Sequence, residues 1–100
     1  MDKSDFLNFR ALALEVRQLR SLAAEEALYL AKVEEKTAAL LAIEAAIGSL
    51  DAPVERLLMR LRYIEGRGWT SVCDVLRPLG YSERQVYRLH GFALQKLKEV

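Results

Sequence analysis

The residues most able to do chemistry lie close together near the end of the chain, in the stretch SERQVYRLHG over residues 82–91. An arginine can pair with phosphate or read a guanine edge, and a tyrosine can bond phosphate or contact a thymine methyl group. A glutamate can accept a hydrogen bond from cytosine. These residue types predict contact with double-stranded DNA. The candidate DNA-binding residues are Ser82, Glu83, Arg84, Gln85, Tyr87 and Arg88.

A helix over residues 82–98 would present these side chains on one face. Ser82 and Gln85 have the spacing of a capping box, in which each side chain binds the backbone N–H of the other residue. Gly80 before them is suited to a tight turn. The apolar residues that follow recur at helical spacing and predict the inner face, which consists of Val86, Leu89, Ala93, Leu97 and Val100.

Two more helices are predicted before this one. The first runs from Pro53 to about Glu65, carries an apolar stripe and ends at the glycine pair of residues 66 and 68. The second is short and runs from about Trp69 to Leu76, because Pro78 cannot lie deep inside a helix. Three helices whose last two are joined by a glycine-containing turn form the helix-turn-helix pattern.

The first half of the chain has a different character. Between Ser4 and Ile47 there is no Gly or Pro, and strong helix formers dominate, so the simplest prediction is one long helix. Gly48 stands where a left-handed helix stop would lie, and Asp51 can cap the next helix. We therefore expect an all-α protein, with a long coiled-coil-like segment over residues 1–50 and a helix-turn-helix domain over residues 51–100.

An apolar seam runs along this first segment at alternating steps of three and four residues. Such a seam needs a partner helix, since a helix of that length extends beyond the small domain that follows. Two chains can pair along it, or one chain can fold back as a hairpin near Arg20 to Ala24, with Ser21 as the cap of the second helix. Because nothing there resembles a turn, we expect a homodimer. The seam consists of Phe9, Leu12, Val16, Leu19, Ala23, Glu26, Leu30, Val33, Thr37, Leu40, Glu44 and Ile47.

Charge and composition narrow the function. Residues 1–50 hold 6 Lys or Arg against 8 Asp or Glu, whereas residues 51–100 hold 9 against 6, so a polyanion would contact the second half. The single Cys73 and the absence of a long apolar run favour a cytoplasmic protein without a membrane span, in a bacterial cell or a phage-infected host.

Nothing in the chain is typical of an enzyme. There is no phosphate-binding glycine loop and no paired nucleophile and base, so we expect no catalytic residue, cofactor, metal or small-molecule substrate. Trp69 is predicted to anchor the core, and Cys73 to be a packed thiol. His90 is predicted to be partly buried, in a packing or phosphate-contacting role.

The stretch SERQVYRLHGFALQKLK resembles the recognition helix of region four of bacterial sigma factors. LRYIEGRGW, residues 61–69, is similar to small phage-encoded proteins of that type, including late-gene transcription activators. The resemblance covers about residues 53–98 and implies that Glu83, Arg84, Tyr87 and Arg88 contact promoter DNA. The chain carries about three more residues than that pattern between Trp69 and Ser82, so either the second helix is longer or the turn is enlarged.

These observations predict a sequence-specific transcription regulator of phage or prophage type, with the helix of residues 82–98 in the major groove. Two alternatives stay open. The chain can be a protein-binding module that docks on RNA polymerase or another regulator. It can also be a DNA-packaging subunit of the small-terminase type, which likewise joins a helix-turn-helix to oligomerising helices and assembles into rings.

Overall fold

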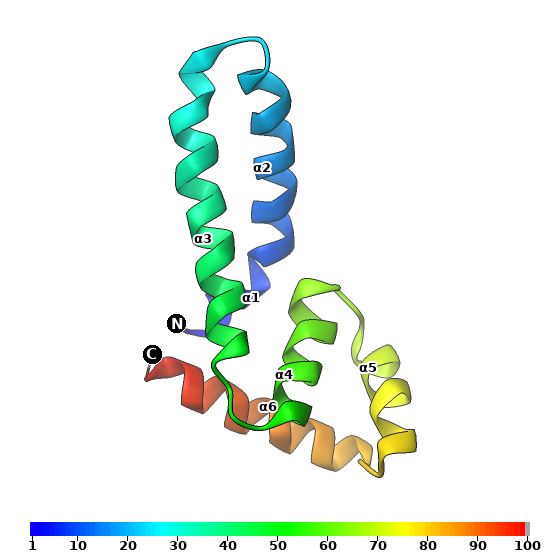
Figure 1. The fold of residues 1–100 in the computed structure, drawn as a ribbon. Helices are drawn as coiled ribbons and strands as arrows, with labels where there is room; N and C mark the ends of the chain where they lie inside the picture. Colours follow the sequence, from blue (N-terminus) through cyan, green and yellow to red (C-terminus); the bar gives the residue numbers. More distant parts are fainter. Residues whose placement is uncertain (100) are drawn as a thin grey trace.

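Two long helices lie side by side as a hairpin over residues 9–48, and the helices of residues 53–98 form a head (Figure 1). The computed structural model describes residues 1–99, and all regular secondary structure within that range is helical. The predicted all-α class is therefore confirmed. Val100, which was expected on the inner face of the last helix, lies outside the described residues.

The hairpin replaces the single long helix, so that prediction is wrong. A short helix α1 (Lys3–Leu7) precedes α2 (Phe9–Ala23), and a turn of 3-10 helix η1 (Ala27–Tyr29) leads into α3 (Leu30–Gly48). The chain reverses a few residues later than the hairpin alternative placed it. Ser21 therefore lies inside α2 and caps no helix.

The apolar seam explains why the chain folds back. Its residues from the two halves face each other across the hairpin, where Val16 and Val33 are buried together with Phe9 and Ile47 nearer the base. Lys36 and Glu15 form a salt bridge at 2.9 Å across the exposed edge of the hairpin, and such an exposed pair adds only a little to stability. The two helices of one chain cover most of the predicted seam, and Glu26 and Leu30 near the tip are exposed. A homodimer would have to use another surface.

Helices occupy the three places predicted in the head. The first consists of α4 (Pro53–Met59) and a π-helical turn η2 (Arg60–Ile64), in which the N–H of Glu65 donates to the carbonyl oxygen of Arg60 at 2.9 Å. It is followed by α5 (Trp69–Leu76), the 3-10 turn η3 (Arg77–Leu79) and α6 (Glu83–Lys98).

The connection between hairpin and head differs from the predicted one. Gly48 belongs to the last turn of α3 and has no positive φ, so it is not a left-handed stop. The cap of α4 is Ala52 rather than Asp51, and Pro53 supplies the preset φ of a first helical turn. Arg56 holds the connection in place, since its guanidinium donates to the carbonyl oxygens of Leu50 and Asp51.

The base of the hairpin and the head share one hydrophobic core. Its members come from α1, α2 and α3 as well as from every long helix of the head, so burial links the two halves of the sequence. Such shared burial supplies most of the stability of a domain of this size. The most completely buried side chains are Phe6, Ile47, Leu58, Met59, Leu76, Leu97, Val72 and Val86.

Candidate nucleic-acid interface

The start of α6 is built as the sequence predicts. Gly80 adopts the left-handed conformation with φ of 95°, which a residue with a Cβ rarely adopts. Ser82 then caps the helix: its Oγ accepts from the N–H of Gln85 at 3.2 Å, while the side-chain oxygen of Gln85 accepts from the N–H of Ser82 at 2.8 Å. The capping box is therefore confirmed, and it occupies Ser82 Oγ and Gln85 Oε1 as acceptors.

The six candidate DNA-binding residues are all exposed. Arg84 and Arg88 lie one helical turn apart on α6, and within residues 1–99 neither guanidinium has a hydrogen-bond or ion-pair partner. Two unpaired arginines at i and i+4 repel each other slightly, and an external anion would relieve that repulsion. They are the groups most available to a ligand.

Tyr87 is less free than the two arginines. Its ring packs against Trp69 with the centroids 5.1 Å apart, and its hydroxyl donates to Glu83 at 3.5 Å. Burial raises the pKa of Tyr87, and the Glu83 carboxylate raises it further. Because 44% of the side chain is exposed, Tyr87 can still touch a ligand with its outer edge. Its main contact, however, is within the protein.

Arg62 joins this surface, although it was not predicted as a site residue. Its guanidinium lies over the ring of Trp69, 4.7 Å from the centroid, and it also donates to the carbonyl oxygen of Arg67 at 3.0 Å. A guanidinium held over an indole keeps its outer N–H groups available to anions. The spacing of Arg62 and Trp69 gave no hint of the contact, because Arg62 lies within the π-helical turn, which changes the direction of its side chain.

His90 fixes the position of α6 from below. Its Nε2 lies 2.5 Å from the hydroxyl of Tyr63, and its ring meets the edge of Trp69 at a centroid distance of 4.7 Å. Burial lowers the pKa of His90 to about 4, and the positive charges of Lys3 and Arg62 lower it further. The imidazole is therefore neutral near pH 7, and either ring tautomer can make the hydrogen bond to Tyr63. The predicted packing role is confirmed, whereas a contact with phosphate does not suit so buried a ring.

Trp69 and Cys73 complete the layer beneath the surface. Trp69 packs against His90 and Tyr87 and so has the anchoring role that was predicted. Cys73 is buried, as expected of a packed thiol. Burial raises the pKa of the Cys73 thiol, and the Glu83 carboxylate also raises it. A raised pKa keeps the sulfur in its less reactive protonated form.

The extra residues before α6 lie in the turn rather than in the preceding helix. α5 ends at Leu76, and Pro78 lies within η3, which ends at the left-handed Gly80. Between the two options the sequence left open, the turn is therefore the enlarged element. Pro78 suits this position because the first turn of a 3-10 helix needs no N–H donor there.

Comparison with protein families, with curated proteins and with solved structures finds no significant match to this chain. Its function has to be inferred from its own residues. Among residues 1–99, no group of three His, Cys, Asp or Glu side chains is placed to hold a metal ion. In the same range, every helix is too short or too polar to cross a bilayer.

Proposed function

We propose that the protein is a sequence-specific DNA-binding regulator of transcription, whose helix α6 enters the major groove as the second helix of a helix-turn-helix. The observation that carries this proposal is the pair of exposed, unpaired guanidinium groups of Arg84 and Arg88 at the start of α6. The resemblance of residues 82–98 to region four of sigma factors supports it and favours a phage or prophage origin.

Charge and shape support the same proposal. An α-helix fits the width of the major groove, and the first two turns of such a helix contact the base edges in helix-turn-helix proteins. Arg62 and Trp69 lie beside those turns, through the contact of Trp69 with Tyr87. Arg62 can therefore pair with a backbone phosphate while Arg84 and Arg88 reach into the groove.

The double variant Arg84→Ala and Arg88→Ala tests the proposal. We expect it to bind DNA at least about tenfold more weakly, because each lost contact of this kind costs about 1 kcal/mol or more. Fragments selected from a random DNA pool by the unaltered protein serve as the probe in a mobility-shift assay. Binding by the unaltered protein should weaken steeply as salt rises.

A matched control removes the same number of positive charges elsewhere. Lys32→Ala with Lys98→Ala changes one exposed lysine in the hairpin and one at the far end of α6. This variant should keep most of its affinity, and both variants should keep the helical circular dichroism spectrum. Equal affinity of the arginine variant and the unaltered protein would rule out the proposal that Arg84 and Arg88 contact DNA.

A protein-binding role has one observation in its favour. An apolar groove of about 400 Å³ lies on the head between α4 and the turn before α6, lined by Pro53, Val54, Leu57, Leu79 and Tyr81. An exposed groove of this kind is typical of protein contact. In this second candidate function, the head docks on RNA polymerase or another regulator, and DNA contact is secondary.

The groove makes a separate prediction. Leu79 is 59% exposed, so Leu79→Asp should leave the fold intact while placing a charge in the groove. If the head docks on RNA polymerase, the protein will shift promoter DNA only when polymerase is present, and Leu79→Asp will abolish that shift. A shift by the protein alone that Leu79→Asp leaves unchanged would exclude this second candidate.

A further inference from the structure

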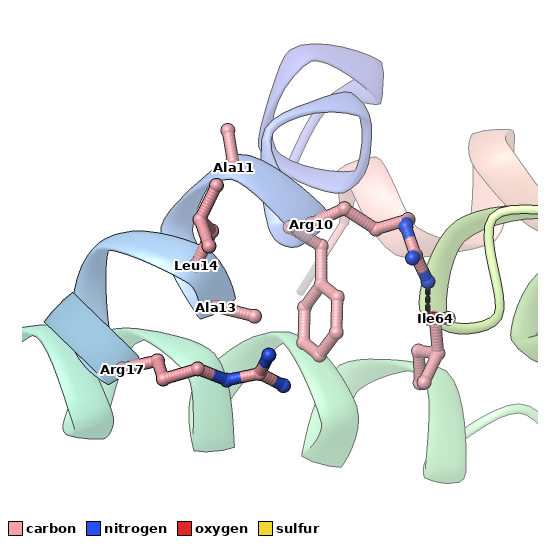
Figure 2. Close-up of a pocket in the computed structure, with 7 residues that line it drawn as sticks. Arg10, Ala11, Ala13, Leu14, Arg17 and Ile64 are labelled. Carbon is pink, nitrogen blue, oxygen red and sulfur yellow. Dashed lines mark hydrogen bonds between the residues drawn. The ribbon is translucent and has the colours of Figure 1, made fainter.

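A cleft of about 450 Å³ lies at the base of the hairpin, between α2 and the end of η2 (Figure 2). Its apolar lining includes Phe9, Leu14 and Ile64, and its charged lining is Arg10 and Arg17. Figure 2 shows both arginines extending from α2 toward the head, where Arg10 donates to the carbonyl oxygen of Ile64 at 3.1 Å. The cleft is thus apolar with a positive rim.

The guanidinium of Arg17 is available for a further contact, because within residues 1–99 it makes no hydrogen bond or ion pair. Arg10 donates one N–H group to the carbonyl oxygen of Ile64, and its other N–H groups can donate to a second acceptor. An occupant of this cleft should therefore combine an apolar side chain with nearby carboxylates. An isolated apolar side chain would leave the arginines unused.

The tip of the hairpin has that combination. Leu28 is 83% exposed, the highest value among the large hydrophobic residues found exposed in residues 1–99. Glu25 and Glu26 precede it, are exposed, and have no ion-pair partner within the same residues. Exposed apolar residues are common singly, but a leucine at a loop tip beside two unpaired carboxylates matches the chemistry of the cleft.

We propose that the protein forms a two-fold symmetric dimer in which the hairpin tip of each copy docks in the cleft of the other. Leu28 enters the apolar part of the cleft, and Glu25 and Glu26 approach Arg10 and Arg17. The tip cannot reach the cleft of its own chain, because α2 is a rigid helix that carries the chain about 9 Å further, from Arg17, the cleft residue nearest the tip, to Ala23, at about 1.5 Å per residue. The occupant is therefore a second copy.

The two-fold symmetry limits the assembly to two chains, because both tips and both clefts are then occupied. When two hairpins lie antiparallel, the tip of one meets the base of the other, and the reverse contact forms at the same time. Each favourable contact then occurs twice in the dimer. This pairing differs from the pairing of two chains along the seam that the sequence predicts, because most of that seam is covered within each hairpin.

The hairpin also gains support that it lacks alone. Within residues 1–99, Val16 and Val33 are the buried side chains nearest the tip, while Leu22 and Leu30 beyond them are exposed. Two helices with so little burial are held mainly by their base, because helical stability in proteins comes from packing. A second hairpin alongside would cover part of this apolar surface.

The proposal is tested by the mass of the full chain in solution. Light scattering should give about twice the 11.4 kDa of one chain, and Leu28→Asp should weaken dimerisation at least about tenfold, because it moves a charge into an apolar cleft. Leu28 makes no buried contact in the single chain, so the variant should keep its helical spectrum. Leu79→Asp is the control, since it changes an exposed leucine of the head.

Charge reversal identifies the partners. Arg17→Glu should weaken dimerisation, and so should Glu25→Arg combined with Glu26→Arg. Mixing these two variants should restore part of the lost dimerisation. In the mixed dimer one contact joins an unaltered cleft to an unaltered tip, and in the other contact the carboxylate introduced at position 17 faces the positive tip. The mixed dimer is detected by tagging one variant and measuring the second in the captured fraction.

Several results would overturn the proposal. These are a monomer at millimolar concentration, a ring-sized mass, a Leu28→Asp protein as dimeric as the unaltered one, or a mixture of the charge variants that stays monomeric. The dimer does not rest on DNA binding. The Arg84→Ala and Arg88→Ala variant should therefore dimerise normally. The dimer proposal and the DNA-binding proposal can thus fail independently of each other.

Discussion

Between pH 6.5 and pH 4 the free energy of unfolding should fall by about 3 kcal/mol because of His90 alone. His90 is buried between Tyr63 and Trp69, and burial is the main reason that its pKa drops from 6.5 to about 4. Lys3 of α1 and Arg62 of η2 add positive charge near the ring and lower the pKa further. The folded protein therefore resists protonation of this imidazole.

The direction of the effect follows from proton binding. Above about pH 7.5 the imidazole is almost entirely neutral in both states, so His90 adds almost no pH dependence there. As pH falls below 6.5 the unfolded chain binds a proton and the folded protein does not, and the unfolded state gains about 1.4 kcal/mol per pH unit. Below about pH 4 both states are protonated, and the loss from this residue is complete.

Urea denaturation at a series of pH values measures this loss, with His90→Gln as the comparison. Glutamine does not titrate, so the variant should lack the decline between pH 6.5 and pH 4 while it shares every other titration. One such shared group is Asp2, whose pKa is lowered by the hydrogen bonds from Ser4. Parallel pH profiles for the two proteins would show that His90 is protonated in the fold as easily as in water.

The start of α6 could be predicted because its signals are local. Gly80, Ser82 and Gln85 lie within a few residues of one another, and each acts on the backbone next to it. A left-handed turn and a capping box depend little on the rest of the molecule. The exposure of Arg84 and Arg88 followed from the same helix, once its apolar face was assigned.

The hairpin could not be predicted in the same way. Its reversal over residues 24–29 contains no Gly or Pro, and the period of the seam is the same whether its partner is a second chain or the same chain. Whether one chain folds back or two chains pair depends on the entropy lost in closing the loop compared with the entropy lost on association. No local sequence pattern reports on either entropy. Glu26, one of three polar residues in the seam, was the one available hint, since it lies at the tip.

Side-chain contacts between different helices of the head could not be predicted from the sequence either. Arg62 over Trp69 and Tyr63 against His90 both depend on how far the first helix of the head is rotated. The π-helical turn at Arg60–Ile64 inserts an i→i+5 hydrogen bond and changes that rotation, and its occurrence cannot be seen in the spacing of apolar residues. The lone histidine among several aromatic residues was the only sign that such a cluster exists.

An ion pair between Glu55 and Lys96 was also missed, because its partners lie on two different helices of the head. Glu55 lies in the first turn of α4 and is buried, and both its carboxylate oxygens accept from the Lys96 ammonium of α6, at 2.9 and 3.0 Å. The lysine side chain is 52% exposed. The pair therefore joins the first and last helices of the head, with its anion inside and its cation at the surface.

Lys96→Met should destabilise the protein by about 3 kcal/mol, the lower end of the range for removing one partner of a buried ion pair. Methionine keeps most of the apolar contact made by the lysine stem, so the loss reports on the charge. The Glu55 carboxylate would then lie buried without its cation. The lower end applies because water can approach from the side of the exposed ammonium.

Thermal and urea unfolding at pH 7 measure the effect, with Lys98→Met as the control. Lys98 lies two residues further along α6, is exposed, and makes no ion pair within residues 1–99. Its loss should therefore change the free energy of unfolding by no more than about 0.5 kcal/mol.

The double variant Glu55→Met with Lys96→Met separates the burial cost from the attraction. Since it leaves no charge in the core, it should recover most of the stability that Lys96→Met alone loses. If the double variant is instead less stable than Lys96→Met, the carboxylate of Glu55 must be well solvated without its lysine. The contact between α4 and α6 would then depend on apolar packing alone.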